Sequence, residues 1–326
     1  MMQIFKTQEF GLLQTDMTNI SIILVNWNGK KDTLACLASL KKLKVKSSRE
    51  AGSSSAGQKL NVKSIVVDNG STDDSVIVIK KNFPDVDVIE TGRNLGFSGG
   101  NNAGIRKALE QGADFVWLLN NDTVVDPNAL AALVDAFQDS RVGIAGSKIY
   151  FAPGREYHKD RYGVKDRGRV LWYAGGIIDW KNMYASHRGV DEVDTGQYEI
   201  LEQTSFVTGC SMMIKSQVFE DVGLFDGKFF AYLEDVDFCL RAKQGGYKLL
   251  YVPQSILWHN NAGSSGVGSE LHQYYMTRNR LLVGLRYASA RTKLALIREA
   301  LRFVFVGPSI YRKAVIDALV GKWGKA

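Results

Sequence analysis

Four times near its start, the chain passes from a short apolar segment straight into a group of polar side chains. The apolar segments are predicted strands, and the stretches between them carry apolar residues at helical spacing, as Leu34, Leu37 and Leu40 do. Strands that alternate with helices form right-handed crossovers and a mostly parallel sheet covered on both faces. The sequence therefore predicts an α/β fold. The predicted strands are residues 21–27, 64–68, 85–91 and 114–120, and predicted helices include residues 101–112 and the segment opened by Asp126-Pro127.

Polar side chains follow each of these four predicted strands. A single Asn or Asp after a strand commonly caps a turn or the next helix. Ligands of open parallel sheets, in contrast, bind beyond the carboxyl ends of the strands, where all four groups converge. Four groups in succession therefore predict a ligand site at this edge of the sheet. The groups are Asn26-Trp27-Asn28, Asp68-Asn69-Gly70, Arg93-Asn94 and Asn120-Asn121-Asp122.

The composition is that of a soluble globular protein, with 45% hydrophobic and 23% charged residues among 326. The three cysteines are widely spaced without a C-x-x-C pair, which favours reduced core thiols over a zinc site. No apolar run reaches the length of a signal peptide or of a membrane span. We therefore expect a cytoplasmic protein, either free or peripheral on the inner face of the cell membrane.

The glycine-rich stretch "RNLGFSGGNNAG" at 93–104 suggests a ligand loop, but its position argues against a dinucleotide. A G-x-G-x-x-G should follow the first strand directly, and no G-x-x-x-x-G-K-[ST] is present either. We expect these glycines to let the backbone approach a ligand closely, with the neighbouring asparagines as hydrogen-bond donors.

Six motifs follow one another in order along the chain. They are "VNWNG", "VVDNGSTDDS", "GRNLGFSGGNNAG", "LLNNDTVVDP", "VTGCSMMIKSQVFEDVGLFDGKFFAYLEDVDFCLRAKQGGY" and "LWHNNAGSS". Together, from about residue 20 to about residue 280, they resemble the family-2 inverting glycosyltransferases, and within them the rhamnosyltransferase-like branch. The resemblance implies a GT-A fold, a nucleotide-diphosphate-sugar donor and a divalent metal ion.

The resemblance assigns donor binding to the ends of the first strands. Val25 and Asn26 border the base, Asp68 accepts a hydrogen bond from its imide N–H, and Arg93 lies close by. Uracil and thymine carry that donor and cytosine does not, so a dTDP- or UDP-sugar is expected, with dTDP-rhamnose suggested by the branch. Asp68 also fits a cap of the following helix, and the two roles are compatible. Further nucleotide-sugar contacts are implied at Asn69, Asn94, Gly99, Asn102, Asn120, Asn121 and, as a phosphate contact in "YYMTRN", Arg278.

The "NND" at 120–122 matches the DxD-type motif of the family, with Asn120 in place of the first Asp. The resemblance makes Asp122 the metal-binding carboxylate and His259 the metal-coordinating imidazole. Mn²⁺ or Mg²⁺ held by one carboxylate, substrate phosphates, water and one imidazole is chemically reasonable, and the imidazole favours Mn²⁺. The alternative for His259 is a strand-end histidine that is hydrogen-bonded to the backbone.

The segment "YLEDVDFCLR" carries a second group of carboxylates. On the residues alone, Glu234 and Asp235 are acidic residues favoured at a helix start, and Asp237 and Arg241 form an ordinary ion pair. The resemblance instead makes Asp235 the catalytic base and Glu234 a contact of the acceptor or of neighbouring groups. Such a base removes the proton of an acceptor hydroxyl as it attacks the anomeric carbon, and one displacement inverts the configuration.

The resemblance also divides the chain into an N-terminal extension (1–19), a GT-A catalytic domain (20–269) and a basic helical extension (270–326). The catalytic domain has a nucleotide-sugar half (about 20–150) and an acceptor half (about 151–269), and a Lys-, Ser- and Gly-rich stretch at about 44–62 is expected to be a mobile insertion. The acceptor is a glycan or a lipid-linked molecule of polysaccharide or cell-envelope synthesis; no nucleic acid is expected, and the oligomeric state stays open. The alternative functions are a catalytically inactive nucleotide-sugar-binding module and a glycoside hydrolase.

The positive charge is concentrated at the end of the sequence. Residues 270–326 contain eleven Lys or Arg against three Asp or Glu, whereas the rest of the chain is nearly neutral. Within residues 281–326, Leu294, Ile297, Leu301 and Val304 fall on one helical face, with arginines beside it. One interpretation packs this face on the catalytic domain, and the other rests it on an anionic membrane.

Overall fold

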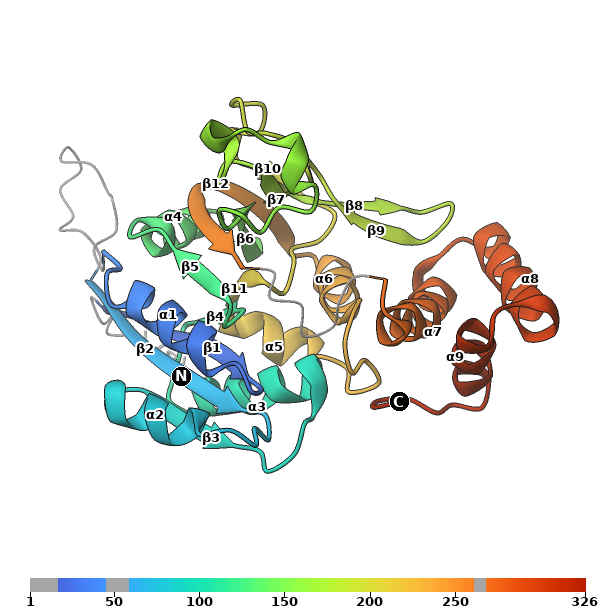
Figure 1. Cartoon of the computed structure of the whole chain (residues 1–326), viewed down its shortest axis with the longest axis horizontal. Helices are drawn as coiled ribbons and strands as arrows, with labels where there is room; N and C mark the ends of the chain where they lie inside the picture. The colour runs from blue at the N-terminus through green and yellow to red at the C-terminus, as the bar shows by residue number, and fades with distance from the viewer. Residues whose placement is uncertain (1–16, 45–58, 261–267) are drawn as a thin grey trace, which may run out of the picture.

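The computed structural model describes residues 17–44, 59–260 and 268–326, which form a central sheet with helices on both faces (Figure 1). The strands are β1 (Met17–Asn26), β2 (Lys59–Asp68), β3 (Asp87–Glu90), β4 (Phe115–Leu119), β5 (Thr123–Val125), β6 (Val142–Phe151), β7 (Leu171–Tyr173), β8 (Gly176–Asp179), β9 (Tyr184–His187), β10 (Glu202–Gln203), β11 (Ser211–Lys215) and β12 (Lys248–His259). The helices are α1 (Lys30–Leu40), α2 (Ser75–Asn82), α3 (Gly96–Glu110), α4 (Ala129–Asp135), α5 (Ser216–Val222), α6 (Glu234–Gln244), α7 (Glu270–Tyr287), α8 (Ala290–Val306) and α9 (Ser309–Leu319).

The main sheet has the strand order β10-β12-β6-β11-β4-β1-β2-β3, with β5 beside β12 and β7 beside β6. Strands β4, β1, β2 and β3 are parallel neighbours, and β12 is parallel to β6. Strand β11 lies antiparallel between β4 and β6 and joins the two parallel parts. The predicted α/β fold with a mostly parallel sheet is confirmed, and β11 is the main departure from it.

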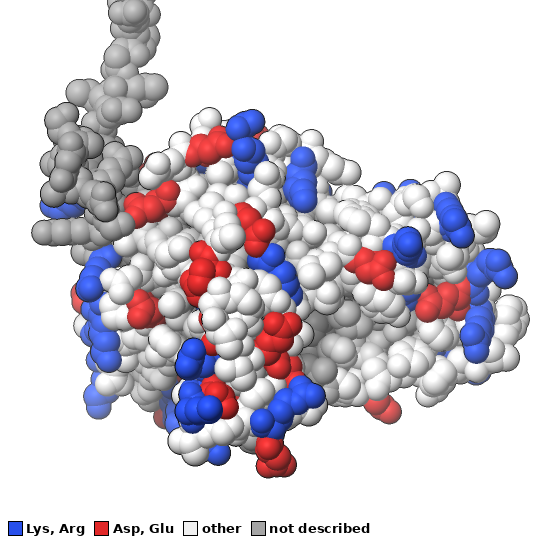
Figure 2. All heavy atoms as spheres, turned by 90° about the horizontal axis from the view of Figure 1, so that it is seen from above, with Lys and Arg blue, Asp and Glu red and all other residues white. Residues whose placement is uncertain are grey.

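The C-terminal segment is helical, as the sequence predicted. Helices α7, α8 and α9 lie together at one side of the sheet, at the right in Figure 1. Seen from above, blue Lys and Arg side chains stand over this right-hand end of the molecule (Figure 2). Within the described ranges, no helix is both long and apolar enough to cross a membrane.

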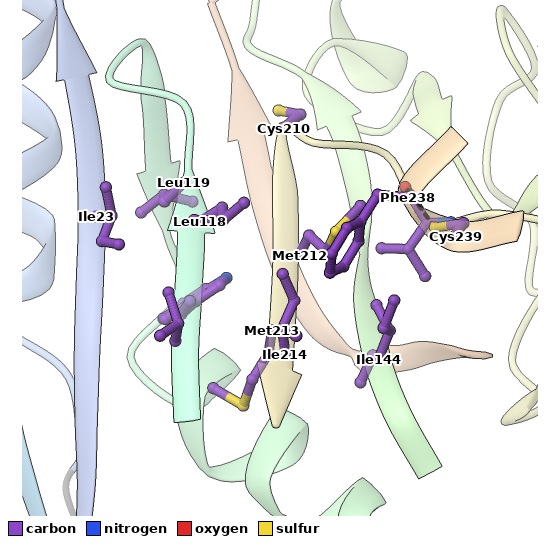
Figure 3. Close-up of a cluster of buried hydrophobic side chains, with 14 of the residues drawn as sticks. Ile23, Leu118, Leu119, Ile144, Cys210, Met212, Met213, Ile214, Phe238 and Cys239 are labelled. Atoms are coloured by element: carbon purple, nitrogen blue, oxygen red, sulfur yellow. Dashed lines mark hydrogen bonds between the residues drawn. The ribbon is translucent and has the colours of Figure 1, made fainter. Parts of the chain in front are cut away.

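The core lies on both faces of the central strands. Ile22, Ile23 and Leu24 of β1 are all fully buried in succession, because helices cover both faces of a parallel sheet and leave no solvent side. Apolar side chains of β4 and β11 interdigitate at the junction of the two parts, among them Met212 beside Phe238 of α6 (Figure 3). This packing fixes the positions of the strand ends.

Two glycines of α3 serve packing against the sheet, and close approach of a ligand to this glycine-rich stretch stays a prediction. A Cβ on Gly104 would lie 2.5 Å from a methyl carbon of Ile23, and one on Gly100 would lie 2.9 Å from a methyl carbon of Val25. Both distances are shorter than real contacts, so these glycines let α3 lie directly on the sheet. The helix accordingly begins at residue 96, five residues before the predicted start.

The predicted insertion ends earlier than expected. Strand β2 begins at Lys59, and Leu60 is buried in the core, so residues 59–62 belong to the sheet. The remainder of the predicted insertion, 45–58, lies outside the described residues, as does most of the predicted N-terminal extension (1–16).

Candidate functional site

The polar groups that follow β1, β2 and β4 are joined by hydrogen bonds at one edge of the sheet. The Nδ2 of Asn26 donates to the Oδ2 of Asp68 at 2.9 Å. The Oδ1 of Asn26 accepts from the hydroxyl of Thr33 at 2.8 Å, and that hydroxyl in turn accepts from the Nδ2 of Asn121 at 2.8 Å. The predicted convergence of these strand ends is therefore confirmed. Thr33 of α1, which the sequence did not single out, connects the side chains of Asn26 and Asn121.

The loop after β3 is held against the end of β2. The Nδ2 of Asn69 donates to the Oδ1 of Asn94 at 3.3 Å, and its Oδ1 accepts from the backbone N–H of Leu95 at 3.0 Å. Gly70 has a φ of +78°, and a Cβ there would lie 2.6 Å from the backbone of Arg93. Glycine is required at this turn, and the loop presents an exposed Arg93 side chain next to the strand ends.

Asp68 stabilises the turn after β2 and does not cap the following helix, whose N-cap is Asp74. The Oδ1 of Asp68 accepts from the backbone N–H of Ser71 at 2.9 Å, while its Oδ2 takes the bond from Asn26. Each carboxylate oxygen keeps a second lone pair. The contact with a nucleotide base stays a prediction.

Asp122 and His259 meet where β5 pairs with β12. The antiparallel register sets Thr123 opposite His259, so the residue before Thr123 lies beside the imidazole. The Nε2 of His259 is 3.0 Å from the Oδ1 of Asp122. The ring is buried and packs edge-on against Trp172 at 4.6 Å between centroids. His259 thus faces a carboxylate rather than the backbone, and metal binding by this pair stays a prediction.

This pair fits a hard divalent cation whose other ligands come from a substrate. A carboxylate oxygen and an imidazole nitrogen at this separation are both donors that Mn²⁺ accepts. Across the described ranges, no group of three or more His, Cys, Asp or Glu side chains is arranged to hold a metal. Two protein donors leave most of the coordination sphere to phosphate oxygens and water.

Asp235 is presented at the start of α6 by a strained segment. Tyr232 and Leu233 both have left-handed backbones, with φ of 69° and 66°, a conformation that costs free energy for residues other than glycine. The Oδ2 of Asp235 accepts from the backbone N–H of Gly209 at 3.0 Å, and its Oδ1 accepts from that of Val236 at 2.8 Å. Two N–H donors fix this carboxylate and leave it partly accessible.

The two neighbouring carboxyls of α6 have different protonation preferences. Burial raises the pKa of Glu234 well above its ordinary value, and the charge of Asp235 adds to that rise. Burial also raises the pKa of Asp235, but the N–H groups of Gly209 and Val236 oppose the rise. The Oε2 of Glu234 is buried without a hydrogen-bond partner among the described residues. Glu234 therefore holds its proton more tightly, and Asp235 is the member of the pair suited to accept one.

The segment Gly209-Cys210 joins the carboxylate of Asp235 to the "NND" turn. While Gly209 donates to Asp235, the carbonyl oxygen of Cys210 accepts from the backbone N–H of Asn120 at 2.9 Å. Burial raises the pKa of the Cys210 thiol, and the charges of Asp122 and Asp235 both contribute to that rise. The two-residue segment Gly209-Cys210 thus lies between the Asp235 carboxylate and the "NND" turn. Sequence reasoning missed this segment, because it acts through its backbone.

Three of the residues expected to bind the donor have other partners. Asn102 is buried, and its amide donates to and accepts from the backbone of Phe225. A Cβ on Gly99 would lie 2.6 Å from the side chain of Leu95, the residue that precedes α3.

The third is Arg278 of α7, whose side chain is fully buried. Its guanidinium lies over the rings of Tyr274, Tyr275 and Trp323 and donates to the carbonyl oxygens of Lys228 and Lys322. These contacts hold the C-terminal segment against α7, so the structure does not bring Arg278 together with the strand ends.

Comparison with known proteins identifies the family and the fold of the chain. The family model described as glycosyl transferase family 2 matches residues 21–223. An uncharacterized protein, y4gI, from Sinorhizobium fredii is 28% identical over 216 residues, which are 63% of this chain but only 22% of that protein. The N-acetylglucosaminyl-diphospho-decaprenol L-rhamnosyltransferase of Mycobacterium tuberculosis is 27% identical over 213 residues, 62% of this chain and 67% of the relative.

Among solved structures, GalNAc-T7 with UDP, GalNAc and Mn²⁺ superposes with a TM-score of 0.55. The sequences are 16% identical, and the superposition covers 89% of this chain and 58% of that one. This similarity concerns the fold, which is that of the GT-A glycosyltransferases. The family match covers more than half of the chain and contains both the strand ends and the "NND" turn. The chain belongs to glycosyl transferase family 2.

Proposed function

We propose that this chain is an inverting glycosyltransferase that moves a sugar from a nucleotide-diphosphate donor to a hydroxyl of a glycan or lipid-linked acceptor. One observation carries the proposal. The Asp122–His259 pair and the Asp235 carboxylate, which serve opposite ends of such a reaction, lie on either side of the two-residue segment Gly209-Cys210.

The donor is bound at the ends of β1, β2 and β4. Asp68 accepts the imide N–H of uracil or thymine, Val25 and Asn26 border the base, and Asn121 lies beside the ribose and diphosphate. The network through Thr33 supports this assignment, because it holds the polar side chains in fixed positions before any ligand arrives. The resemblance favours a dTDP- or UDP-sugar, and the name of the mycobacterial relative, an L-rhamnosyltransferase, favours rhamnose as the sugar.

Asp122 and His259 would hold a divalent cation, Mn²⁺ or Mg²⁺, together with the donor diphosphate. When bound, the cation supplies positive charge to the leaving diphosphate and acts as a Lewis acid. Trp172 supports the site from behind, because its ring fixes the orientation of the imidazole. The backbone N–H of the neighbouring Asn120 donates to the carbonyl oxygen of Cys210. The side chain of Asn120 is an amide, so it adds no second carboxylate to the site.

Asp235 is the base of the reaction. Its carboxylate takes the proton of the acceptor hydroxyl while the hydroxyl oxygen forms a bond to the anomeric carbon. The bond from that carbon to the diphosphate oxygen breaks on the opposite face, the nucleoside diphosphate leaves, and the configuration is inverted. The N–H donors of Gly209 and Val236 aim the base and oppose the rise of its pKa, whereas burial raises the pKa of Glu234 further.

The acceptor approaches from the side of the C-terminal helices. A cavity of about 320 Å³ lies between β9, α7, α8 and α9. The ring of His272 on its wall lies 4.9 Å from the ring of Tyr232, three residues before Asp235. The cavity is lined by both apolar and polar side chains, which suits the boundary between the lipid and the polar head of a lipid-linked acceptor. The lining includes Tyr184, His272, Met276, Arg280, Phe303 and Tyr311.

Turnover with defined donors tests this function. Purified protein is incubated with Mn²⁺, an acceptor extract and each of a series of dTDP- and UDP-sugars, and released nucleoside diphosphate and labelled product are measured. We expect release that needs both the cation and the acceptor. A nucleotide-sugar-binding module would bind a donor without release, and a glycoside hydrolase would cleave glycosides in chelator without any nucleotide.

A further inference from the structure

Helix α8 has two apolar faces, and among the described residues protein covers one of them. Thr292, Leu296 and Ala300 are buried against the neighbouring helices, and Leu296 packs so closely on α7 that a Cβ on Gly284 would lie 2.2 Å from it. The opposite face carries an exposed apolar stripe, defined as Leu294, Ile297, Leu301 and Phe305. Their exposed fractions are 60%, 44%, 49% and 76%.

The spacing of these four residues makes the stripe continuous. Steps of three and four residues keep side chains on one side of a helix over three turns. The sequence interpretation that packs this face on the catalytic domain is wrong for Leu294, Ile297 and Leu301, because all three are exposed, whereas Leu296 and Ala300 on the opposite face are buried. An exposed line of large apolar side chains on a soluble helix marks an interaction surface.

Positive charge lies along one edge of the stripe. Arg291, Arg298 and Arg302 recur at steps of seven and four residues and are all exposed. Residues 289–326 contain eight Lys or Arg and only two acidic residues, and both acids have partners. Glu299 pairs with Arg280 on the covered side, and Asp317 accepts from Tyr274. Figure 2 shows blue side chains, with fewer red ones, at the right-hand end of the molecule, where the C-terminal helices lie.

We propose that the exposed stripe of α8 docks on an anionic lipid surface. An apolar stripe with arginines beside it is the pattern of helices that lie in the plane of a membrane interface, with the apolar side chains among the acyl chains and the cations at the headgroups. A second copy of the chain is a poorer occupant. Two such faces packed together would bring their arginine rows close to each other without acidic residues to neutralise them.

Docking would also orient the candidate acceptor cavity. Glu299 and Phe303 line that cavity, and they lie on the side of α8 opposite the stripe. The cavity would then stand about one helix diameter, roughly 10 Å, above the lipid. The docking inference does not depend on the proposed reaction, because it concerns only α8 and its charges.

Vesicle co-sedimentation tests the inference. The full chain is mixed with vesicles of phosphatidylcholine alone or of phosphatidylcholine with phosphatidylglycerol. Two triple variants are compared, Ile297→Gln with Leu301→Gln and Phe305→Gln, and Arg291→Gln with Arg298→Gln and Arg302→Gln. A control with the same change of charge carries Lys42→Gln, Lys63→Gln and Lys81→Gln, which are exposed on the catalytic body. Circular dichroism verifies that each variant is folded.

We expect binding to the anionic vesicles only, weakened by salt. The arginine variant should bind roughly a hundredfold more weakly, because each basic side chain at an anionic surface contributes about a factor of five. The apolar variant should lose binding to a similar extent, and the lysine control should keep it. Equal binding by the apolar variant would overturn the inference, as would absence of binding by the parent. A parent dimer that the apolar variant converts to a monomer would instead assign the stripe to self-association.

Discussion

Two aspartates on the first turns of α6 should respond to the same substitution in opposite ways. Asp235→Asn should abolish most of the transfer while leaving the protein folded, and Asp237→Asn should mainly destabilise it. Asp235 is partly accessible and accepts two backbone N–H groups. Asp237 is fully buried and accepts from Arg241, Arg286 and Tyr287 at 3.0, 2.6 and 2.8 Å.

The expected magnitudes follow from these contacts. Asn at 235 cannot take a proton, so transfer should fall by about 10²–10⁴-fold. The variant loses one hydrogen bond to a charged group, about 1.5–3 kcal/mol, but it also removes a carboxylate whose pKa is raised by burial, which offsets much of that cost. Asn at 237 removes the carboxylate that Arg241 and Arg286 share, although Arg286 keeps Asp226 as a partner. Breaking a buried ion pair costs about 3–5 kcal/mol, which for a chain of this size lowers the Tm by roughly 10 °C.

Thermal unfolding and single-turnover transfer, measured on the same preparations, separate the two effects. Asp235→Asn should unfold near the parent temperature, bind donor with unchanged affinity and show almost no product. Asp237→Asn should unfold at a clearly lower temperature, with transfer per folded molecule reduced much less. Parent-like transfer by Asp235→Asn would refute its assignment as the base.

Three further predictions concern the fall of the transfer rate at low pH, the metal ion and the packing of α3. Because burial raises the pKa of Asp235 and the base acts only when ionised, transfer should fall as the pH drops through a value above that of an ordinary aspartate, and a rate that stays level down to about pH 4 would contradict this. Asp122→Ala should remove metal-dependent donor binding, and excess chelator should abolish transfer by the parent; full activity in chelator would point to a metal-free reaction. Gly104→Ala should destabilise the fold by roughly 1–3 kcal/mol, because the new methyl would collide with Ile23, whereas Gly227→Ala, which has open space, should leave the Tm unchanged. Equal unfolding temperatures for these two variants would show that α3 can move away from β1.

The parts of the fold that could be predicted from the sequence are those that depend on local patterns. Three of the four predicted strands were identifiable as short apolar runs, and the convergence of the strand ends followed from the geometry of parallel sheets. The hydrogen bond between Asn26 and Asp68 is a direct result of that geometry. The pairing of Asp122 with His259, 137 positions apart in the chain, came only from the resemblance to known motifs.

What could not be predicted depends on partners distant in the sequence. Gly100 and Gly104 look the same whether a ligand or a strand lies against them, and only the structure shows the strand. Arg278 matched a motif, yet three aromatic rings enclose it. On α8, the residues of both faces are apolar, so periodicity alone did not reveal that Leu296 is covered and Leu301 is exposed.

Calorimetric titration with nucleoside diphosphates tests the central claim most directly. UDP, dTDP, CDP and GDP are titrated into the parent and into Asp122→Ala, each with Mn²⁺ and with chelator. If the ends of β1, β2 and β4 form a metal-dependent site for a uracil or thymine nucleotide, UDP or dTDP should bind the parent with Mn²⁺. CDP should not bind, and the binding should vanish in chelator and in the variant. Failure of all four nucleotides to bind the parent, or binding that is the same in chelator and in Asp122→Ala, would contradict the account.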